Sequence, residues 1–79
     1  MSNYWQEELA LVEAAALRIQ AREEVAEKLF EEALSRHEEA GTGLPAKQMQ
    51  EFTAWMACRH DSDAAWGRWA TVMDARPPA

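Results

Sequence analysis

Cysteine is almost absent from this chain of 79 residues, in which Cys58 is the only one. A single thiol cannot form a disulfide within the chain, and a lone unpaired thiol is typical of a reducing compartment. A domain of this size buries only about 60% of the surface that its unfolded chain exposes, so its own core gives marginal stability. We therefore expect a partner chain to contribute stability.

Long hydrophobic runs and an excess of positive charge are also missing. The longest uninterrupted apolar run, residues 14–17, is far short of the roughly 20 residues that cross a bilayer. Residues 1–8 have neither the basic nor the apolar part of a signal peptide. Eight basic residues against 14 acidic residues give a net charge of −6, which argues against nucleic acid or anionic lipid as the main partner. We expect a cytoplasmic protein of a bacterium, phage or plasmid, with no membrane partner.

Glycine and proline are scarce, with three of each, and their positions divide the chain into two long segments. Residues 4–40 contain neither and are rich in Ala, Leu, Glu and Arg, which favour helix. Gly41 suits the C-terminus of a helix, and Pro45 suits the first turn of the next one. The sequence predicts a single all-α domain over residues 1–79, with a helix at about 3–40, a loop at 41–44, a helix at about 45–75 and a frayed tail at 76–79.

Apolar residues in both segments recur at alternating spacings of three and four, the 3.5-residue repeat of a coiled coil. We expect Leu17, Val25, Leu29 and Leu34 to widen the apolar row of the first helix, as a helical bundle requires. The predicted rows are Trp5, Leu9, Val12, Ala16, Ile19, Glu23, Ala26, Phe30, Ala33, His37 and Ala40 in the first helix, and Met49, Phe52, Met56, Arg59, Asp63, Trp66, Ala70 and Met73 in the second.

The polar interruptions of the two rows fall at one level when the second helix is folded back on the first. In that arrangement Phe30 faces Met56, and Glu23 lies opposite Arg59 and Asp63. The sequence therefore predicts an antiparallel two-helix hairpin, resembling a coiled coil, with a buried polar layer of these three charged residues. Such a layer fixes the register of two helices and needs no substrate to explain it.

Tryptophan is abundant, with four residues, and its placement predicts association with another chain. Trp55 and Trp69 are predicted to lie off the seam between the helices, where they would form a large exposed apolar patch that monomers rarely tolerate. We therefore expect the hairpin to form a homodimeric four-helix bundle or to dock on another protein. The predicted interface residues are Trp5, Trp55, Trp69, Phe52 and Met56.

A different all-α fold remains open because the second helix has a weak point. Asp61 or Ser62 is a good helix N-cap, and Gly67 lowers the helix propensity of the segment that follows. The alternative is a three-helix bundle with a break near Asp61.

Residue patterns for catalysis or cofactor binding are not found in the sequence. His37 and His60 lack the glutamate three residues earlier that di-iron helical bundles use. The glycines at 41 and 43 are not followed by the Lys-Ser/Thr pair of a phosphate-binding loop. We therefore expect no enzyme activity, no metal site and no cofactor.

The predicted function is that of a small non-enzymatic protein-interaction or regulatory protein that uses an aromatic face of its second helix. Residues 1–40 hold ten acidic residues against four basic ones, so one alternative is an acidic nucleic-acid mimic that inhibits a basic protein. The hairpin, with Arg18 and Arg22 one turn apart, also resembles the Rop class of small plasmid proteins, two-helix hairpins that dimerise into an acidic four-helix bundle and grip paired RNA loops. This resemblance implies an RNA-binding hairpin dimer.

Overall fold

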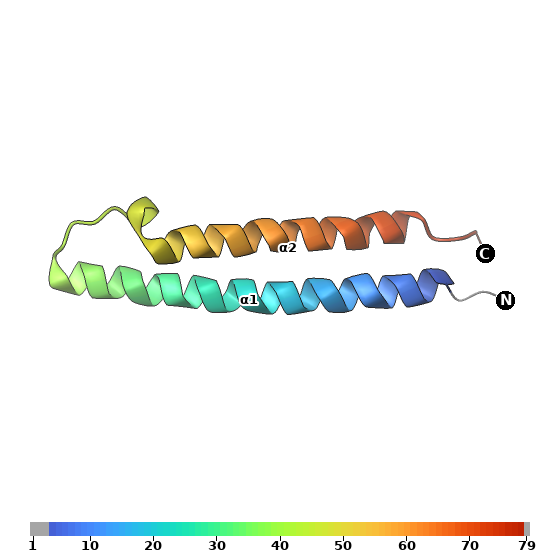
Figure 1. Ribbon diagram of the computed structural model, residues 1–79, viewed down its shortest axis with the longest axis horizontal. Coiled ribbons are helices and arrows are strands. Elements are labelled where there is room, and N and C mark those ends of the chain that lie inside the picture. The colour runs from blue at the N-terminus through green and yellow to red at the C-terminus, as the bar shows by residue number, and fades with distance from the viewer. Residues whose placement is uncertain (1–3, 79) are drawn as a thin grey trace.

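The computed structural model describes residues 4–78, which form a long antiparallel helical hairpin (Figure 1). Helix α1 spans Tyr4–Ala40 and helix α2 spans Gln50–Asp74, with a short 3₁₀ helix, η1, at Ala46–Gln48 between them. The body measures 63 × 15 × 15 Å, and no strand occurs in the described range. The predicted all-α hairpin is therefore confirmed.

Helix α1 ends at the glycine that the sequence predicts. Gly41 has a φ of +64°, a backbone conformation that favours glycine. The N–H groups of Gly41 and Thr42 donate hydrogen bonds to the carbonyls of Glu38 and His37, each at 3.2 Å. This pair of bonds is a Schellman motif, and it satisfies two carbonyls that the end of the helix would otherwise leave without donors.

Helix α2 begins at Gln50, later than predicted. Pro45, which was expected in the first turn of this helix, has an extended backbone and precedes η1 instead. Met49 is also extended and caps α2, while its side chain, 2% exposed, fills the closed end of the hairpin. The extended backbone at these two residues rules out a continuous helix from Pro45. The predicted start of the first helix at Asn3 and the predicted tail residue Ala79 lie outside the described residues.

The three-helix alternative is wrong, because α2 is continuous through residues 60–63. Ser62, considered as a helix N-cap, is only 4% exposed and lies in the contact between the helices. Asp61 is exposed in the middle of the same helix. The uninterrupted helix keeps Trp55, Ser62 and Trp69, which are seven residues apart, on the face that meets α1.

A narrow seam of mostly small residues holds the two helices together. Small side chains at a helix–helix contact allow the axes to lie close together. The predicted row of α1 is confirmed from Trp5 to His37, whose members are all buried or half-buried, and only Ala40 is exposed. The buried residues are Ala16, Ala26, Phe30, Ala33, Met49, Ser62, Ala65 and Val72.

The seam of α2 is rotated by one residue from the predicted row, a turn of about 100°. The observed row contains no charged residue, whereas the predicted row contains two. Burying an unpaired charge costs far more than burying a cysteine or a serine, so the rotated seam is favoured. From residue 55 onward the seam contains Trp55, Cys58, Ser62, Ala65, Trp69 and Val72 in place of Met56, Arg59, Asp63, Trp66, Ala70 and Met73.

The register of the two helices along their axes is close to the predicted one. Phe30 stacks on Trp55, with ring centroids 5.4 Å apart and an interplanar angle of 22°. Nearer the open end, Trp66 Nε1 donates a hydrogen bond of 2.9 Å to Gln20 Oε1. The predicted neighbour of Phe30 was Met56, so prediction and structure agree to within one residue.

Candidate interaction surfaces

The predicted buried polar layer does not form. Arg59 and Asp63 are exposed on α2, and Glu23 is half-buried on α1. No ion pair between these three residues is found in the described part of the chain. The rotation of α2 moves both of its charged residues out of the seam, and Ser62 occupies the position predicted for Asp63.

Trp55 and Trp69 lie in the seam, so the prediction that they lie off it is wrong. Both side chains are half-buried, and their indole nitrogens are buried without a hydrogen-bond partner among residues 4–78. These two residues therefore pack inside their own hairpin. Phe52 and Met56 beside them are half-buried, and their role in an interface with another chain stays a prediction.

An aromatic cluster packs the half of the hairpin nearest the loop. Phe52 meets Phe30 edge to face, with ring centroids 5.5 Å apart. It meets Trp55 in the same way at 6.2 Å. Together with the stack of Phe30 on Trp55, these contacts join three large rings around the buried Ala33 and Met49. Edge-to-face and offset-stacked pairs stabilise beyond the area that they bury.

Trp5 closes the open end of the hairpin within its own chain. Its Nε1 donates a hydrogen bond of 2.7 Å to the carbonyl of Val72 in the last turns of α2. The guanidinium of Arg76 lies 5.8 Å from the centroid of the Trp5 ring, within cation–π range. Trp66 and Trp69 pack edge to face nearby, with centroids 5.6 Å apart. Trp5, a predicted interface residue, thus contacts α2 of the same molecule.

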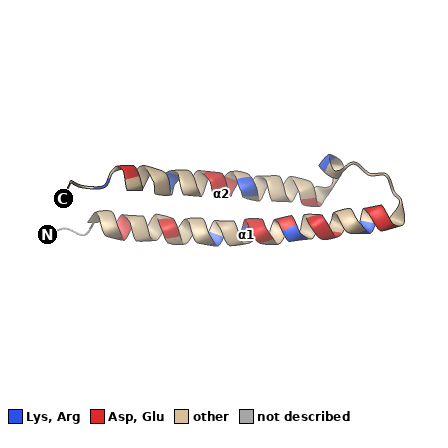
Figure 2. Cartoon of the chain, turned by 180° about the vertical axis from the view of Figure 1, so that it is seen from behind, with Lys and Arg blue, Asp and Glu red and all other residues tan. Residues whose placement is uncertain are grey.

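One side of the seam carries most of the negative charge, and we call it the acidic flank. The hydrogen bond from Trp66 to Gln20 lies on this side. The acidic flank has six acidic residues and only one basic residue, Arg59, and acidic segments recur along α1 in Figure 2. Its main members are Glu13, Leu17, Glu24, Glu27, Glu31 and Glu38 of α1, with Phe52, Met56, Arg59, Asp63 and Trp66 of α2.

The other side of the seam, which we call the neutral flank, is nearly balanced in charge. It has four basic residues and four acidic ones. A shallow groove of about 550 Å³ joins its two helices, and its lining includes Glu8 of α1 and Ala64 and Arg68 of α2. The main members are Tyr4, Glu8, Leu11, Arg18, Arg22, Val25, Leu29, Glu32, Arg36 and Glu39 of α1, with Ala54, Ala57, Asp61, Ala64, Arg68 and Thr71 of α2.

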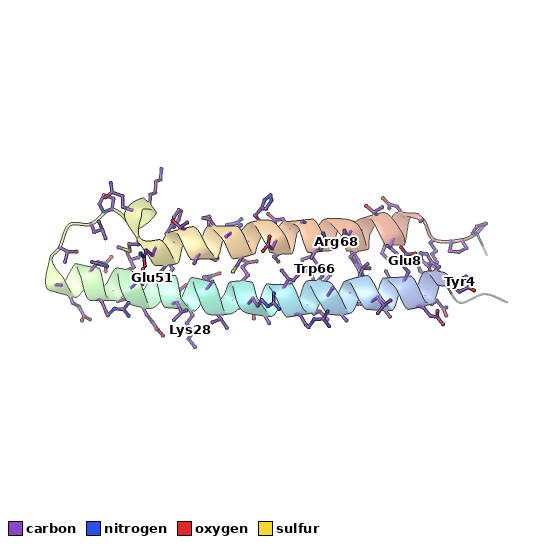
Figure 3. All side chains as sticks on the ribbon, in the orientation of Figure 1. Tyr4, Glu8, Lys28, Glu51, Trp66 and Arg68 are labelled. Atoms are coloured by element: carbon purple, nitrogen blue, oxygen red, sulfur yellow. The ribbon has the colours of Figure 1, made fainter. Side chains whose placement is uncertain are left out.

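Large apolar side chains of α1 are exposed on the neutral flank. Tyr4 is 77% exposed, Leu11 71%, Val25 60% and Leu29 52%. Figure 3 shows Tyr4 at the open end of the hairpin and Trp66, by contrast, between the two helices. We call these four residues the exposed apolar row.

The exposed apolar row corrects part of the sequence prediction. Val25, Leu29 and Leu17 were expected to widen the buried stripe, but the structure exposes all three, and only Leu34 packs against the core. Tyr4 and Leu11 were not singled out at all. Tyr4, Leu11 and Val25 share one position of the seven-residue repeat, in which Arg18 is the interruption, and a search for a second stripe would have found this signal.

The hairpin exposes more surface than a compact protein of its mass. Its accessible surface is 6123 Å², whereas a compact monomer of 9.0 kDa exposes about 4,850 Å². Its radius of gyration is 18.0 Å, against about 12 Å for a compact chain of this length. Each chain therefore has roughly 1,300 Å² of surface beyond that of a compact fold.

Metal ligands are not gathered in the described part of the chain, where no group of three or more His, Cys, Asp or Glu residues could hold an ion. Cys58 is a free, half-buried thiol in the seam. Neither of the two described α-helices has a segment apolar enough to cross a membrane.

No protein-family model, curated protein or solved structure matches this chain. The resemblance to the Rop class therefore depends on the outline of the hairpin alone.

Proposed function

We propose that this protein is a non-enzymatic interaction protein that binds another polypeptide through the exposed apolar row of α1. The supporting observation is that Tyr4, Leu11, Val25 and Leu29 are each at least half exposed and share one side of the hairpin. Arg18 and Arg22 divide the row into two apolar parts, Tyr4 with Leu11 and Val25 with Leu29, and exposed apolar groups rimmed by polar residues mark interaction sites. The row takes the place of the aromatic face of α2, because Trp55 and Trp69 pack within the chain.

The hairpin presents this row on a rigid support. α1 has 37 residues and is anchored to α2 at both ends, by the aromatic cluster near the loop and by the hydrogen bond of Trp5 to Val72. A backbone that is already held as a helix loses little conformational freedom on binding, and this limits the entropic cost of association. A helix of the partner would pack against α1, and the exposed apolar side chains spaced along one face of α1 would anchor it.

Site-specific photo-crosslinking in the native host tests this proposal. A photoreactive amino acid is placed at Leu29 in one variant and at Leu17 in a second. These two leucines lie on the same helix and are both 52% exposed, but they belong to the neutral and acidic flanks respectively. We expect a crosslinked polypeptide with the probe at position 29 and little with the probe at position 17. Equal crosslinking at both positions, or none at position 29, would contradict the proposal.

The acidic flank supports a second candidate function, binding to a basic protein as a nucleic-acid mimic. Six carboxylates with Arg59 as the only basic residue form a negative stripe along the hairpin. Such binding weakens steeply with salt. We expect the triple variant Glu24→Gln, Glu27→Gln and Glu31→Gln to bind the basic protein more weakly. A neutral-flank variant such as Leu29→Gln should bind it as the wild-type chain does. Binding that is insensitive to salt would exclude this function.

RNA binding of the kind that the Rop resemblance implies would use the neutral flank. Arg18 and Arg22 are both exposed there, one turn apart. If RNA is the ligand, Arg18→Glu with Arg22→Glu abolishes RNA retention and leaves helix content intact. Failure of the wild-type protein to retain host RNA would exclude this alternative.

A further inference from the structure

The area of one flank is sufficient for a stable dimer. A face of 63 × 15 Å offers about 950 Å², which exceeds the roughly 800 Å² that each partner buries in a standard interface. Two chains that each buried their excess of roughly 1,300 Å² would together bury about 2,600 Å², within the range of obligate homodimers. A second copy of the chain can therefore cover the surface that the hairpin leaves exposed.

Charge determines which flank a second copy can cover. If the acidic flank met its own copy, six acidic residues of each chain would face one another with only Arg59 of each chain to compensate. Like charges brought together and removed from water oppose association. The neutral flank, with four basic and four acidic residues, has no such excess, and it carries the exposed apolar row. Self-association therefore favours the neutral flank.

The positions of Arg18 and Arg22 argue against an antiparallel contact between the two α1 helices. Both arginines lie between Leu11 and Val25, in the middle of the exposed apolar row. An antiparallel contact that covered Leu11 with Leu29 of a second copy would place Arg18 of each chain opposite Arg22 of the other. Packing α1 against α2 of the second copy removes this contact of Arg18 with Arg22, although the same register then places Arg18 at the level of Arg68 of the second copy.

Side-chain size favours the same arrangement. The neutral flank of α2 consists largely of small residues, among them Ala54, Ala57 and Ala64, while that of α1 carries large ones. The register set by Phe30 and Trp55 places Leu29 at the level of Ala57. If the second copy has its loop at the same end, the same levels meet, so Leu29 of α1 meets the small Ala57 of α2, while Val25 lies at the level of Asp61. Large residues opposite small ones are the pattern of interlocking helical layers.

We propose that the partner of the neutral flank is a second copy of this chain. The two loops lie at the same end, and α1 of each copy packs against α2 of the other, which gives a four-helix bundle in which all neighbouring helices are antiparallel. This inference rests on the proposed function and names its partner.

Sedimentation of two matched variants tests the choice of partner and flank. We expect the wild-type chain to sediment at twice its 9.0 kDa mass. Leu29→Glu should raise the dissociation constant of the dimer at least about 100-fold, because a charge enters the contact of both copies. Leu17→Glu, with the same exposure and the same change in charge, should leave the dimer intact. A monomeric wild-type chain, or a dimer broken by Leu17→Glu rather than by Leu29→Glu, would overturn the inference.

Distances between spin labels test the arrangement of the two copies. The label is attached to Thr42→Cys in a Cys58→Ala background, so that each chain carries one label in its loop. Loops at the same end predict a distance between labels well below half of the 63 Å length of the hairpin. A distance close to the full length would overturn the proposed arrangement. Circular dichroism confirms that the labelled chain keeps its helix content.

The failure of this inference can be distinguished from the failure of the proposed function. A monomeric chain that crosslinks to a different protein through position 29 would refute the homodimer and support the interaction function. A monomeric chain with no crosslink at position 29 would refute both.

Discussion

The two buried indole nitrogens without hydrogen-bond partners give a sharp test of the packing. Trp66 and Trp69 form one edge-to-face pair on α2, and both are half-buried. Trp66 donates a hydrogen bond to Gln20, whereas Trp69 Nε1 has no acceptor among the described residues. Replacing either residue by phenylalanine removes a similar part of the ring and disturbs the same aromatic pair, so the two substitutions differ mainly in the fate of the N–H group.

Opposite signs are expected for the contributions of the two N–H groups. Trp66→Phe loses a hydrogen bond that contributes about 0.5–1.5 kcal/mol to stability. Trp69→Phe removes a buried donor whose unsatisfied state costs about 1–3 kcal/mol. We therefore expect Trp69→Phe to be more stable than Trp66→Phe by about 2 kcal/mol. This difference is a substantial part of the roughly 4–12 kcal/mol that a chain of this length has in total.

Urea unfolding followed by circular dichroism, with all variants at one protein concentration, measures this difference. With a slope of about 1 kcal/mol per molar urea for so small a chain, the midpoints of the two variants should differ by about 2 M. A double-mutant cycle with Gln20→Ala should give a coupling of about 1 kcal/mol with Trp66 and none with Trp69. Equal stability of the two variants, or a less stable Trp69→Phe, would refute the reasoning about the unsatisfied nitrogen.

Further substitutions test other features of the hairpin by the same unfolding assay. Gly41→Ala should lower the free energy of unfolding by about 1 kcal/mol, because the φ of +64° at this residue strains any other side chain. Gly67→Ala should raise it by about 1 kcal/mol, because this glycine is exposed within α2 with open space around it. A stabilising Gly41→Ala or a destabilising Gly67→Ala would contradict the backbone conformation assigned to that glycine. Phe30→Ala should cost about 3–5 kcal/mol, a large part of the total stability, while Leu17→Ala should cost under about 1 kcal/mol. Similar costs for the two variants would mean that the seam is misplaced. Arg36→Ala should change stability by less than about 0.5 kcal/mol, because its ion pair with Glu51 is long and exposed. A larger loss would show that this ion pair is stronger than its geometry indicates.

The hairpin and its register could be predicted from the sequence because several local signals agree. Residues 4–40 have no helix breaker, Gly41 readily adopts the left-handed backbone that ends a helix, and the apolar repeat of α1 has one dominant face. These features depend on backbone preference and on periodicity, which are properties of the sequence itself. The start of α2 could not be predicted in this way, because Pro45 is compatible with both a helical first turn and an extended residue.

The rotation of α2 about its axis could not be predicted from hydrophobicity alone. Two rows one residue apart both carry aromatic residues, and the predicted row includes Met56 and Trp66, which are more apolar than Ser62 and Cys58 in the observed row. The choice between the rows depends on keeping Arg59 out of the seam and on the fit against small residues of α1, and both depend on the other helix. The exposed apolar row was missed for a related reason, since large apolar residues were assumed to be buried.

The joining of the two helices at a single end has a consequence for the order in which the chain folds. The stacked rings of Phe30 and Trp55 lie 25 positions apart in sequence, whereas the hydrogen bond of Trp5 to Val72 joins residues 67 positions apart. Closing the longer loop first would cost about 0.9 kcal/mol more in chain entropy than closing the shorter one. We therefore expect contacts to form first beside the loop and to spread toward the termini, so that the end closed by Trp5 is the last to assemble and the first to open.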